Sequence, residues 1–407
     1  MSREMKDSGI PWIGEIPQSW DIKTLGVFFR ENTKDNHALV STNSLQYKYG
    51  EIIQKPNNDR ELNEQDIDLL KKYTLVKPDD IVVNGLNLNY DFNSLRIARV
   101  KENGIITSAY IVIRPMFEEN SSFFNYLLKS LDYQKVFHGM GTGIRLTLKF
   151  KELSRMSLPI PPTIFEQTLI ADYLDKKCAE IDELIALQEQ MIAQLTTYKQ
   201  AVITETVTKG LDPNVKMKDS GVEWIGEIPE NWDVCKIQYM ANLKSGYNLT
   251  TEQITDEGLY PVYGGNGIRG FYHEFFNDGE YVLIGRQGAL CGNINYSTGK
   301  FWATEHAVIC YPKMQYATKW FGELLRSMNL NQYSLASAQP GLAVERIKAL
   351  SIPLPPLSEQ QTIANYLDQK CKEIDELISV KKEKIEKLKA YKKSVIYEYV
   401  TGKKQVN

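Results

Sequence analysis

The sequence predicts an α+β fold in which two mixed α/β domains are separated by two long helices forming an antiparallel intramolecular coiled coil, with a pseudo-two-fold internal repeat. Three observations predict it. A motif near the N-terminus returns in mid-chain, a long helical pattern occurs twice, and the segments between these repeats are unalike. A chain of 407 residues also exceeds what one hydrophobic core usually supports.

The first repeat is an opening motif of sixteen residues. Residues 6–21 read KDSGIPWIGEIPQSWD and residues 218–233 read KDSGVEWIGEIPENWD, so twelve of sixteen positions are identical. Each copy of such a repeat marks the start of one structural unit. We therefore expect one frame that presents two different domains, roughly residues 22–157 and 234–351. An old duplication that simply drifted is the alternative.

The second repeat is a long helix. Residues 166–207 and 359–400 contain no Pro or Gly, which predicts two helices of about 40 residues and roughly 60 Å. Both copies read I-A-x-Y-L-D-x-K-C-x-E-I-D-E-L-I from Ile170 and Ile363. In each copy, mostly apolar residues recur at alternating steps of four and three, which is the a/d seam of a heptad repeat. Its members are Leu174, Cys178, Ile181, Ile185, Gln188, Ile192, Leu195, Lys199 and Val202, and Leu367, Cys371, Ile374, Ile378, Lys381, Ile385, Leu388, Lys392 and Val395.

Two features qualify these helices. The seam is polar at matching positions, Gln188 or Lys381 and Lys199 or Lys392, and these side chains either fix the register or contact a partner. Proline pairs, at 161–162 and 355–356, cannot continue a strand ladder, so we expect them to end each variable domain before its helix starts.

Composition is that of a globular protein, with 43% hydrophobic and 24% charged residues. The polar N-terminus lacks a signal-peptide pattern, and no apolar run reaches the length of a membrane span, which together predict a cytoplasmic protein. The cysteines are odd in number and form no C-x-x-C pair, so we expect reduced thiols. They are Cys178, Cys235, Cys291, Cys310 and Cys371.

The formal net charge of −3 restricts how this chain contacts nucleic acid. Residues 1–157 carry 21 basic and 20 acidic side chains, and residues 216–351 carry 12 and 14. Phosphate neutralisation supplies most non-specific affinity for DNA. A DNA-binding face must therefore be a local basic patch, or a partner must add positive charge.

A glycine-rich stretch, residues 263–270, contains a formal G-x-G-x-x-G. The dinucleotide fingerprint requires a helix directly after its glycines, whereas residues 271–276 read as a strand. The stretch suits close approach to DNA backbone and base edges better, and Asn266 is its candidate contact.

Candidate base-reading residues follow short apolar runs. Arg286 and Gln287 come after residues 281–283; Arg pairs with guanine and Gln with adenine through two hydrogen bonds. A β-turn whose Arg makes a structural ion pair is the alternative. Asn84 and Asn87 follow the predicted strand 81–83 and suit adenine, although Asn-Gly also makes ordinary turns. Arg145 completes the set, chosen for its chemistry and loop placement.

No catalytic or metal-binding motif is recognisable. Gly299-Lys300 is followed by Phe301 and is no phosphate-binding loop, and the His residues, at 37, 138, 273 and 306, lack metal-ligand spacing. Pro78-Asp79-Asp80 has no Glu-x-Lys after it. We therefore expect neither catalytic residues nor a metal site.

The repeated D-S-G-x-x-W-I-G-E-I-P-x-x-W, the P-x-P-P before E-Q, I-A-x-Y-L-D, I-D-E-L-I and the two glycine-containing stretches together resemble the specificity (S) subunit of Type I restriction-modification enzymes. The resemblance covers essentially the whole chain, in motif order as well as in content. It implies a non-catalytic DNA-binding subunit with two target recognition domains, each reading one half of a bipartite asymmetric site. It also implies helices that set the spacer and dock two modification (methyltransferase) subunits.

The resemblance further implies no cofactor in this chain, S-adenosylmethionine and ATP on partner subunits, and restriction (motor-nuclease) subunits as additional partners. The expected division is target recognition domain 1 at 1–157, helical region 1 at 158–211, target recognition domain 2 at 212–351 and helical region 2 at 352–407. Two other classes stay open from the residues alone. One is a structural coiled-coil adaptor joining two modules that do not bind DNA, and the other is a stand-alone enzyme.

Overall fold

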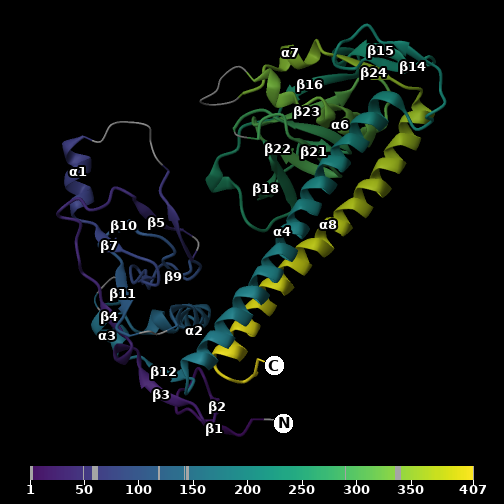
Figure 1. Cartoon of the computed structure of the whole chain (residues 1–407). Coiled ribbons are helices and arrows are strands. Elements are labelled where there is room, and N and C mark those ends of the chain that lie inside the picture. The colour runs from purple at the N-terminus through teal and green to yellow at the C-terminus, as the bar shows by residue number, and fades with distance from the viewer. Residues whose placement is uncertain are drawn as a thin grey trace. The chain divides into compact units, whose positions relative to one another are not determined.

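The computed structural model describes residues 3–48, 50–56, 63–117, 120–141, 143, 146–288, 290–334 and 341–406. The chain forms two compact units (Figure 1). Unit 1 comprises residues 1–188 and 383–407, and unit 2 comprises residues 189–382. Each unit therefore contains one variable domain together with a segment of both long helices.

The two opening motifs fold alike. In unit 1, β1 (Met5–Asp7) pairs antiparallel with β2 (Glu15–Pro17), and in unit 2, β13 (Met217–Asp219) pairs in the corresponding register with β14 (Glu227–Pro229). The second tryptophan of each motif is fully buried, and its indole N–H donates to a glutamate at the start of a long helix. These bonds are Trp20 Nε1 to Glu166 at 3.2 Å and Trp232 Nε1 to Glu359 at 2.9 Å.

A two-stranded ribbon closes each variable domain. The first strand after the opening motif pairs with the last strand before the long helix, in register β3 (Asp21–Thr24) with β12 (Ser157–Ile160) and β15 (Asp233–Lys236) with β24 (Ser351–Leu354). The proline pairs follow these last strands directly. The prediction that they end each domain before its helix is confirmed.

Both variable domains are built on a four-stranded antiparallel sheet of the same topology. In unit 1 the order is β4 (Phe29–Glu31), β11 (Ile111–Pro115), β8 (Ile81–Val83) and β9 (Ile97–Arg99). In unit 2 it is β16 (Ala241–Ser245), β23 (Ala307–Pro312), β20 (Tyr281–Gly285) and β21 (Ile294–Ser297). Both sheets thus place their strands in the order first, fourth, second, third. The segments that look unrelated in sequence share one fold.

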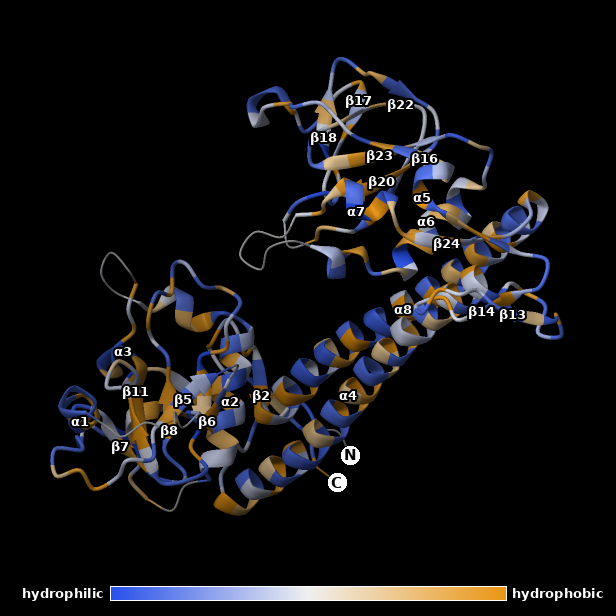
Figure 2. Cartoon of the chain, turned by 90° about the horizontal axis from the view of Figure 1, so that it is seen from above, coloured by the Kyte–Doolittle hydropathy of each residue, from blue (hydrophilic) through white to orange (hydrophobic). Residues whose placement is uncertain are grey.

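One amphipathic helix covers each sheet, α2 (Ser121–Tyr133) in unit 1 and α6 (Thr318–Ser327) in unit 2. Figure 2 shows strands of the central sheets in the orange of hydrophobic residues. The remaining elements differ between the units, except that α3 in unit 1 and α7 in unit 2 are both short helices just before the closing strand. Unit 1 adds β5 (Leu45–Lys48), β6 (Glu51–Gln54), α1 (Glu64–Lys71), β7 (Thr74–Val76), β10 (Gly104–Ile106) and α3 (Phe150–Ser154). Unit 2 adds α5 (Ile237–Met240), β17 (Tyr260–Gly264), β18 (Gly267–Tyr272), β19 (Asn277–Asp278), β22 (Lys300–Ala303) and α7 (Val344–Lys348).

The long helices are α4 (Ile164–Lys209) and α8 (Leu357–Val400), each slightly longer than predicted. Within each unit they lie side by side (Figure 1). Seam residues such as Leu174 and Leu367 are fully buried. The core of unit 1 includes Val395, Ile396 and Val400 of α8, and that of unit 2 includes Ile203 and Val207 of α4. The predicted pairing of the two helices is confirmed.

Cross-helix ion pairs support the register. Lys392 contacts Asp182 at 2.6 Å in unit 1, and Lys199 contacts Asp375 at 2.7 Å in unit 2. Asp182 and Asp375 occupy the same position of the helical repeat, and so do Lys199 and Lys392. The same contact between the two helices therefore occurs once in each unit. Of the two roles open to the polar seam lysines, the structure supports the fixing of register.

Two general properties complete the description. None of the helices among the described residues is long and apolar enough to cross a membrane. The five cysteines are free. Burial raises the pKa of the Cys310 thiol, and it raises the pKa of Cys235 to about 11, so these thiols stay protonated and unreactive at neutral pH.

Candidate nucleic-acid interface

Two polar loops occupy the same place in the two domains. Each follows the strand that lies third across its central sheet and second along the chain. This strand is β8 in unit 1 and β20 in unit 2. The Asn84 N–H donates to the carbonyl of Arg96 at 2.8 Å, and the Gly285 N–H donates to the carbonyl of Asn293 at 2.8 Å. Asn84 and Gly285 are therefore equivalent positions, each bonded to the residue that precedes the neighbouring strand.

The next residue of each loop confirms this equivalence. The carbonyl of Gly85 accepts from the Leu148 N–H, and the carbonyl of Arg286 accepts from the Leu342 N–H, both at 2.9 Å. Leu148 lies two residues before α3, and Leu342 lies two residues before α7. The loops selected in the sequence for their Asn, Arg and Gln residues thus leave the two sheets at the same point.

In the first loop, Asn84 is half-buried and its Oδ1 accepts the Leu86 N–H at 3.2 Å, which closes a local turn. The turn that Asn-Gly predicts is therefore present. Asn87 is exposed and has a φ of 52°, a conformation that Asn adopts more readily than most residues. Asn87 is thus the residue of this pair whose side chain is free to reach outward. Arg145 lies outside the described residues.

In the second loop, Arg286 is half-buried, and its Nη1 donates to the Ser245 hydroxyl at the end of β16 at 3.1 Å. Gln287 is exposed, and its backbone forms an isolated bridge with Gly341. The alternative that Arg286 makes a structural ion pair finds no support among the described contacts of this side chain.

The glycine-rich stretch forms the β17–β18 hairpin, which turns at Gly265 and Asn266. The strand predicted for residues 271–276 begins earlier, at Gly267, and ends at Tyr272, because it pairs with β17 directly after the turn. No helix follows these glycines, so the geometry for a bound pyrophosphate is missing from this hairpin. A Cβ on Gly285 would lie 2.1 Å from the Gly265 carbonyl oxygen, so glycine permits the close approach of hairpin and loop.

The hairpin and the second loop together line an open depression of about 410 Å³ in unit 2. It brings together two predicted residues that are distant in sequence, Asn266 and Gln287. Asn266 is held in place because its Oδ1 accepts from Nδ2 of Asn293 at 2.7 Å. Arg286 is absent from this lining and lies beside it in the chain.

Sequence reasoning missed two side chains in the depression, Arg269 and His306. Arg269 belongs to the glycine-rich stretch, but the sequence did not show that its position on β18 directs its side chain toward the loop. His306 lies just before β23, and its carbonyl accepts from the Arg286 N–H at 2.8 Å. Nothing in its spacing relates it to Gln287; only the strand order does.

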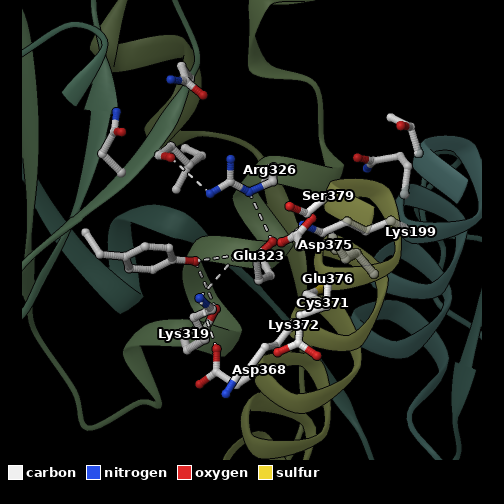
Figure 3. Close-up of a pocket in the computed structure, with 17 residues that line it drawn as sticks. Lys199, Lys319, Glu323, Arg326, Asp368, Cys371, Lys372, Asp375, Glu376 and Ser379 are labelled. Carbon is white, nitrogen blue, oxygen red and sulfur yellow. Dashed lines mark hydrogen bonds and ion pairs between the residues drawn. The ribbon is translucent and has the colours of Figure 1, made fainter. Parts of the chain in front are cut away.

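A different cavity, of about 980 Å³, lies in unit 2 between the recognition sheet, α6 and the long helices (Figure 3). Several of its charged residues are paired, with Lys319 contacting Asp368 at 3.0 Å and Arg326 contacting Glu323 at 3.0 Å. A smaller cavity at the corresponding place in unit 1 is lined by Asp175, Asp182 and Lys392. Both cavities are lined by residues of a variable domain and of the long helices, so we regard them as joints between domain and helices.

Two domains of one topology, each with a polar loop at the same strand end and each attached to a paired helix, define a duplicated protein that presents two equivalent loops. The chain belongs to the family described as Type I restriction modification DNA specificity domain, which matches residues 17–197 and 229–400. The resemblance stated from the sequence motifs is confirmed.

Individual relatives agree with this assignment. The specificity subunit of the Type I restriction enzyme EcoprrI from Escherichia coli is 44% identical over 131 residues, which cover 31% of this chain and 33% of that relative. The specificity subunit of MjaVIII from Methanocaldococcus jannaschii is 23% identical over 427 aligned residues, covering 96% of this chain and 94% of the relative. The first match thus spans a third of its relative, and the second spans nearly all of it.

Solved structures show the same fold. A chain from a structure concerned with assembly and conformational transition of the type I R-M system has a TM-score of 0.72 at 16% identity, covering 95% of this chain and 98% of that one. The HsdS subunit from Thermoanaerobacter tengcongensis has a TM-score of 0.53 at 16% identity, with the same coverage of both chains.

The chain is therefore a DNA specificity subunit of a Type I restriction-modification system, with two target recognition domains. It is a non-catalytic component, and its family binds no cofactor; S-adenosylmethionine and ATP bind the modification and restriction subunits.

Proposed function

We propose that each target recognition domain reads one half of a bipartite, asymmetric DNA site, mainly through the loop that follows β8 in the first domain and β20 in the second. The observation that carries this is the equivalence of the two loops, since unrelated sequences have placed Asn, Arg and Gln at one point of a shared fold. The reading residues are Asn84, Asn87 and Arg145 in the first domain and Asn266, Arg286 and Gln287 in the second. Amide and guanidinium groups of this kind recognise adenine and guanine edges.

The low net charge agrees with local contacts. In the second domain, Arg269 and Arg286 lie in or beside the depression, and the depression's described lining contains no acidic side chain. The DNA-facing patch is thus locally basic within a domain of balanced charge. Partner subunits supply the additional positive field that tight binding requires.

The partners are two modification subunits, with restriction subunits completing the complex. Each unit carries the same set of exposed apolar side chains on its helices, from corresponding positions of the two repeats. The set is Leu184, Leu187 and Tyr391 in unit 1 and Leu377, Val380 and Tyr198 in unit 2, with exposed fractions from 44% to 61%. Repeated apolar groups on a polar helix surface are typical of an interface. Two equivalent sets accommodate two copies of one partner.

We also propose the division into target recognition domain 1 (1–157), helical region 1 (158–211), target recognition domain 2 (212–351) and helical region 2 (352–407). A cytoplasmic location, where genomic DNA is accessible, belongs to the same proposal.

The test of DNA reading is to express the chain with its modification subunits and map the methylated adenines of the host genome. We expect one bipartite asymmetric site, and a gel shift on that DNA should weaken as salt rises. Gln287→Ala should alter only one half-site and Asn87→Ala only the other. Methylation and binding that do not depend on this chain would favour the structural adaptor.

Docking is tested separately. Leu184→Asp with Leu187→Asp should leave a complex with one modification subunit, and so should Leu377→Asp with Val380→Asp, when mass is measured by light scattering. Leu259→Asp, which changes a side chain that is 74% exposed and directly precedes β17 rather than belonging to a long helix, is the matched control. Retention of both subunits by both double variants would assign docking to another surface.

A further inference from the structure

A buried arginine holds the first recognition loop. Arg96 is 1% exposed, and its guanidinium donates to three loop carbonyls. Nη1 reaches the carbonyls of Asn84 at 3.2 Å and Leu86 at 2.6 Å, and Nη2 reaches that of Asp91 at 2.6 Å. These three carbonyls lie in the first eight residues of the loop that runs from residue 84 to residue 96. A loop lacks the hydrogen bonds of a strand ladder, so this side chain supplies the missing donors.

Two further contacts hold Arg96 in place. Its Nη2 lies 3.8 Å from Oδ2 of Asp91, and its backbone N–H donates to the buried carboxyl of Asp132 on α2. Hydrogen bonds from Ser94 and Asn93 lower the pKa of Asp91, which keeps that carboxylate ionised beside the guanidinium. Only the planar fork of arginine presents several donors in fixed directions, and lysine cannot reproduce it.

The second domain uses the same position for the same task. Arg96 directly precedes β9, and the equivalent residue directly before β21 is Asn293. The backbone carbonyl of Arg96 accepts from the Asn84 N–H, and that of Asn293 accepts from the Gly285 N–H at the end of β20, both at 2.8 Å. The side chain of Asn293 then donates to Asn266 at the tip of the β17–β18 hairpin. In both domains, one residue thus bonds to the recognition loop with its main chain and orients recognition groups with its side chain.

We propose that Arg96 and Asn293 are positioning residues that determine base discrimination, each only in the half-site read by its own domain. This inference rests on the proposed function, because it requires the loops to read DNA. Neither residue needs to touch a base. A shift of a loop by less than a hydrogen-bond length removes the alignment that paired hydrogen bonds to a base require.

The experiment uses the whole complex with modification subunits and the site that the wild type methylates. For each variant, affinity is measured for the cognate DNA and for DNA with one base changed in either half-site. The ratio of these affinities is the readout. A folding defect lowers the active fraction but leaves the ratio unchanged, whereas a misplaced loop lowers the ratio.

Arg96→Lys should reduce discrimination at several positions of the first half-site by about tenfold and leave the second half-site as in the wild type. Asn293→Ala, at a half-buried and more tolerant position, should do the reverse. Arg114→Lys is the matched control. Arg114 lies in the same domain and pairs with the fully buried Asp80 at 2.6 Å, but it makes no described contact with the loop. Its replacement should lower the unfolding temperature and keep the ratio.

The outcomes separate the two proposals. If Asn87→Ala lowers discrimination while Arg96→Lys and Asn293→Ala do not, the positioning role is wrong and loop reading stands. If neither loop nor anchor variants change the ratio in any half-site, the loops do not read DNA. Equal loss in both half-sites from either anchor variant also overturns the assignment, because the described contacts of each anchor lie within its own domain.

Discussion

The backbone of Arg286 is held in place while its side chain remains accessible, and both properties suit an arginine that contacts a DNA base. Its backbone is held on both sides, by the His306 carbonyl and by the Leu342 N–H, at 2.8 and 2.9 Å. Its guanidinium is directed by the Ser245 hydroxyl. An arginine oriented in this way loses less conformational entropy when it meets guanine than a freely rotating side chain does.

We predict that Arg286→Ala costs about 1–3 kcal/mol of binding free energy and relaxes one position of the second half-site only. Ser245→Ala should give a weaker effect at that same position, because it removes only the orienting bond. The measurement is affinity for a panel of single-base substituted sites. Equal weakening on all sequences would make Arg286 a phosphate contact, and no change in binding would make it structural.

Arg269 is expected to behave differently. It is exposed on β18, and its stem packs so closely over Gly264 that a Cβ there would lie 2.4 Å from its Cδ. A side chain held at the rim of the depression suits a phosphate. Arg269→Gln should weaken cognate and unrelated DNA by the same factor and reduce the salt dependence by about one charge. A loss confined to one base position would contradict this role.

At the scale of the element, the important feature is that α4 and α8 fix each other's register twice. The pairs Lys392–Asp182 and Lys199–Asp375 are partly exposed, so each contributes at most about 1 kcal/mol. Their main effect is on the register of the helices, because a slip of either helix along the other breaks both ion pairs at once. With a single register, the length of the paired helices has one defined value.

We predict that inserting four residues between Lys199 and Thr204 lengthens α4 by roughly 6 Å, close to two base pairs of DNA rise. Both half-sites should keep their sequences while the gap between them changes, as read by methylation mapping. Partial loss of assembly is also expected, because four residues move the seam out of phase. A seven-residue insertion, which keeps the heptad phase, is the control. An unchanged gap in an active complex would show that helix length does not set the spacer.

At the scale of the whole molecule, each unit is completed by residues from the other half of the sequence. The core of unit 1 contains Val395, Ile396 and Val400, and Gly402 packs against Trp20 after α8 ends. Gly210 packs against Trp232 in the same way after α4. A fragment with one repeat therefore lacks a segment of core that a second copy of its own α4 is able to replace.

We predict that residues 1–211 form a two-fold dimer in which Val202, Ile203 and Val207 of one copy fill the place of the missing α8 residues of the other. With modification subunits, this dimer should methylate a palindromic site made of two inverted first half-sites. Light scattering gives the mass, and methylation mapping gives the site. A monomer, or a dimer that still marks the asymmetric site, would refute the two-unit interpretation.

The contacts of the intact chain supply a control for this dimer. Lys199 of one copy should meet Asp182 of the other, twice. Asp182→Lys should therefore weaken the dimer, and Asp182→Lys combined with Lys199→Asp should restore it. Equal weakening by both variants would mean that the fragment pairs in another register.

The duplication, the two long helices, their seam and the proline joints were all determined by the sequence. These features are local or repeat outright: a heptad is visible in any window of the helix, and Pro restricts the backbone wherever it occurs. The helix bounds differ from the prediction by only two residues at most. The short apolar runs before Asn84 and before Arg286 correctly indicated where β8 and β20 end, and the role of these residues in reading DNA stays a prediction.

Only the tertiary structure decided that the two unlike domains share one sheet order and that their loops are equivalent. Strand pairing joins residues that are far apart in the chain, and nothing local records that β11 lies between β4 and β8 or β23 between β16 and β20. The same holds for Arg96, Asn293, Arg269 and His306, whose partners come from other strands. A residue's own type and spacing describe what it is able to bind, whereas the fold decides what lies within its reach.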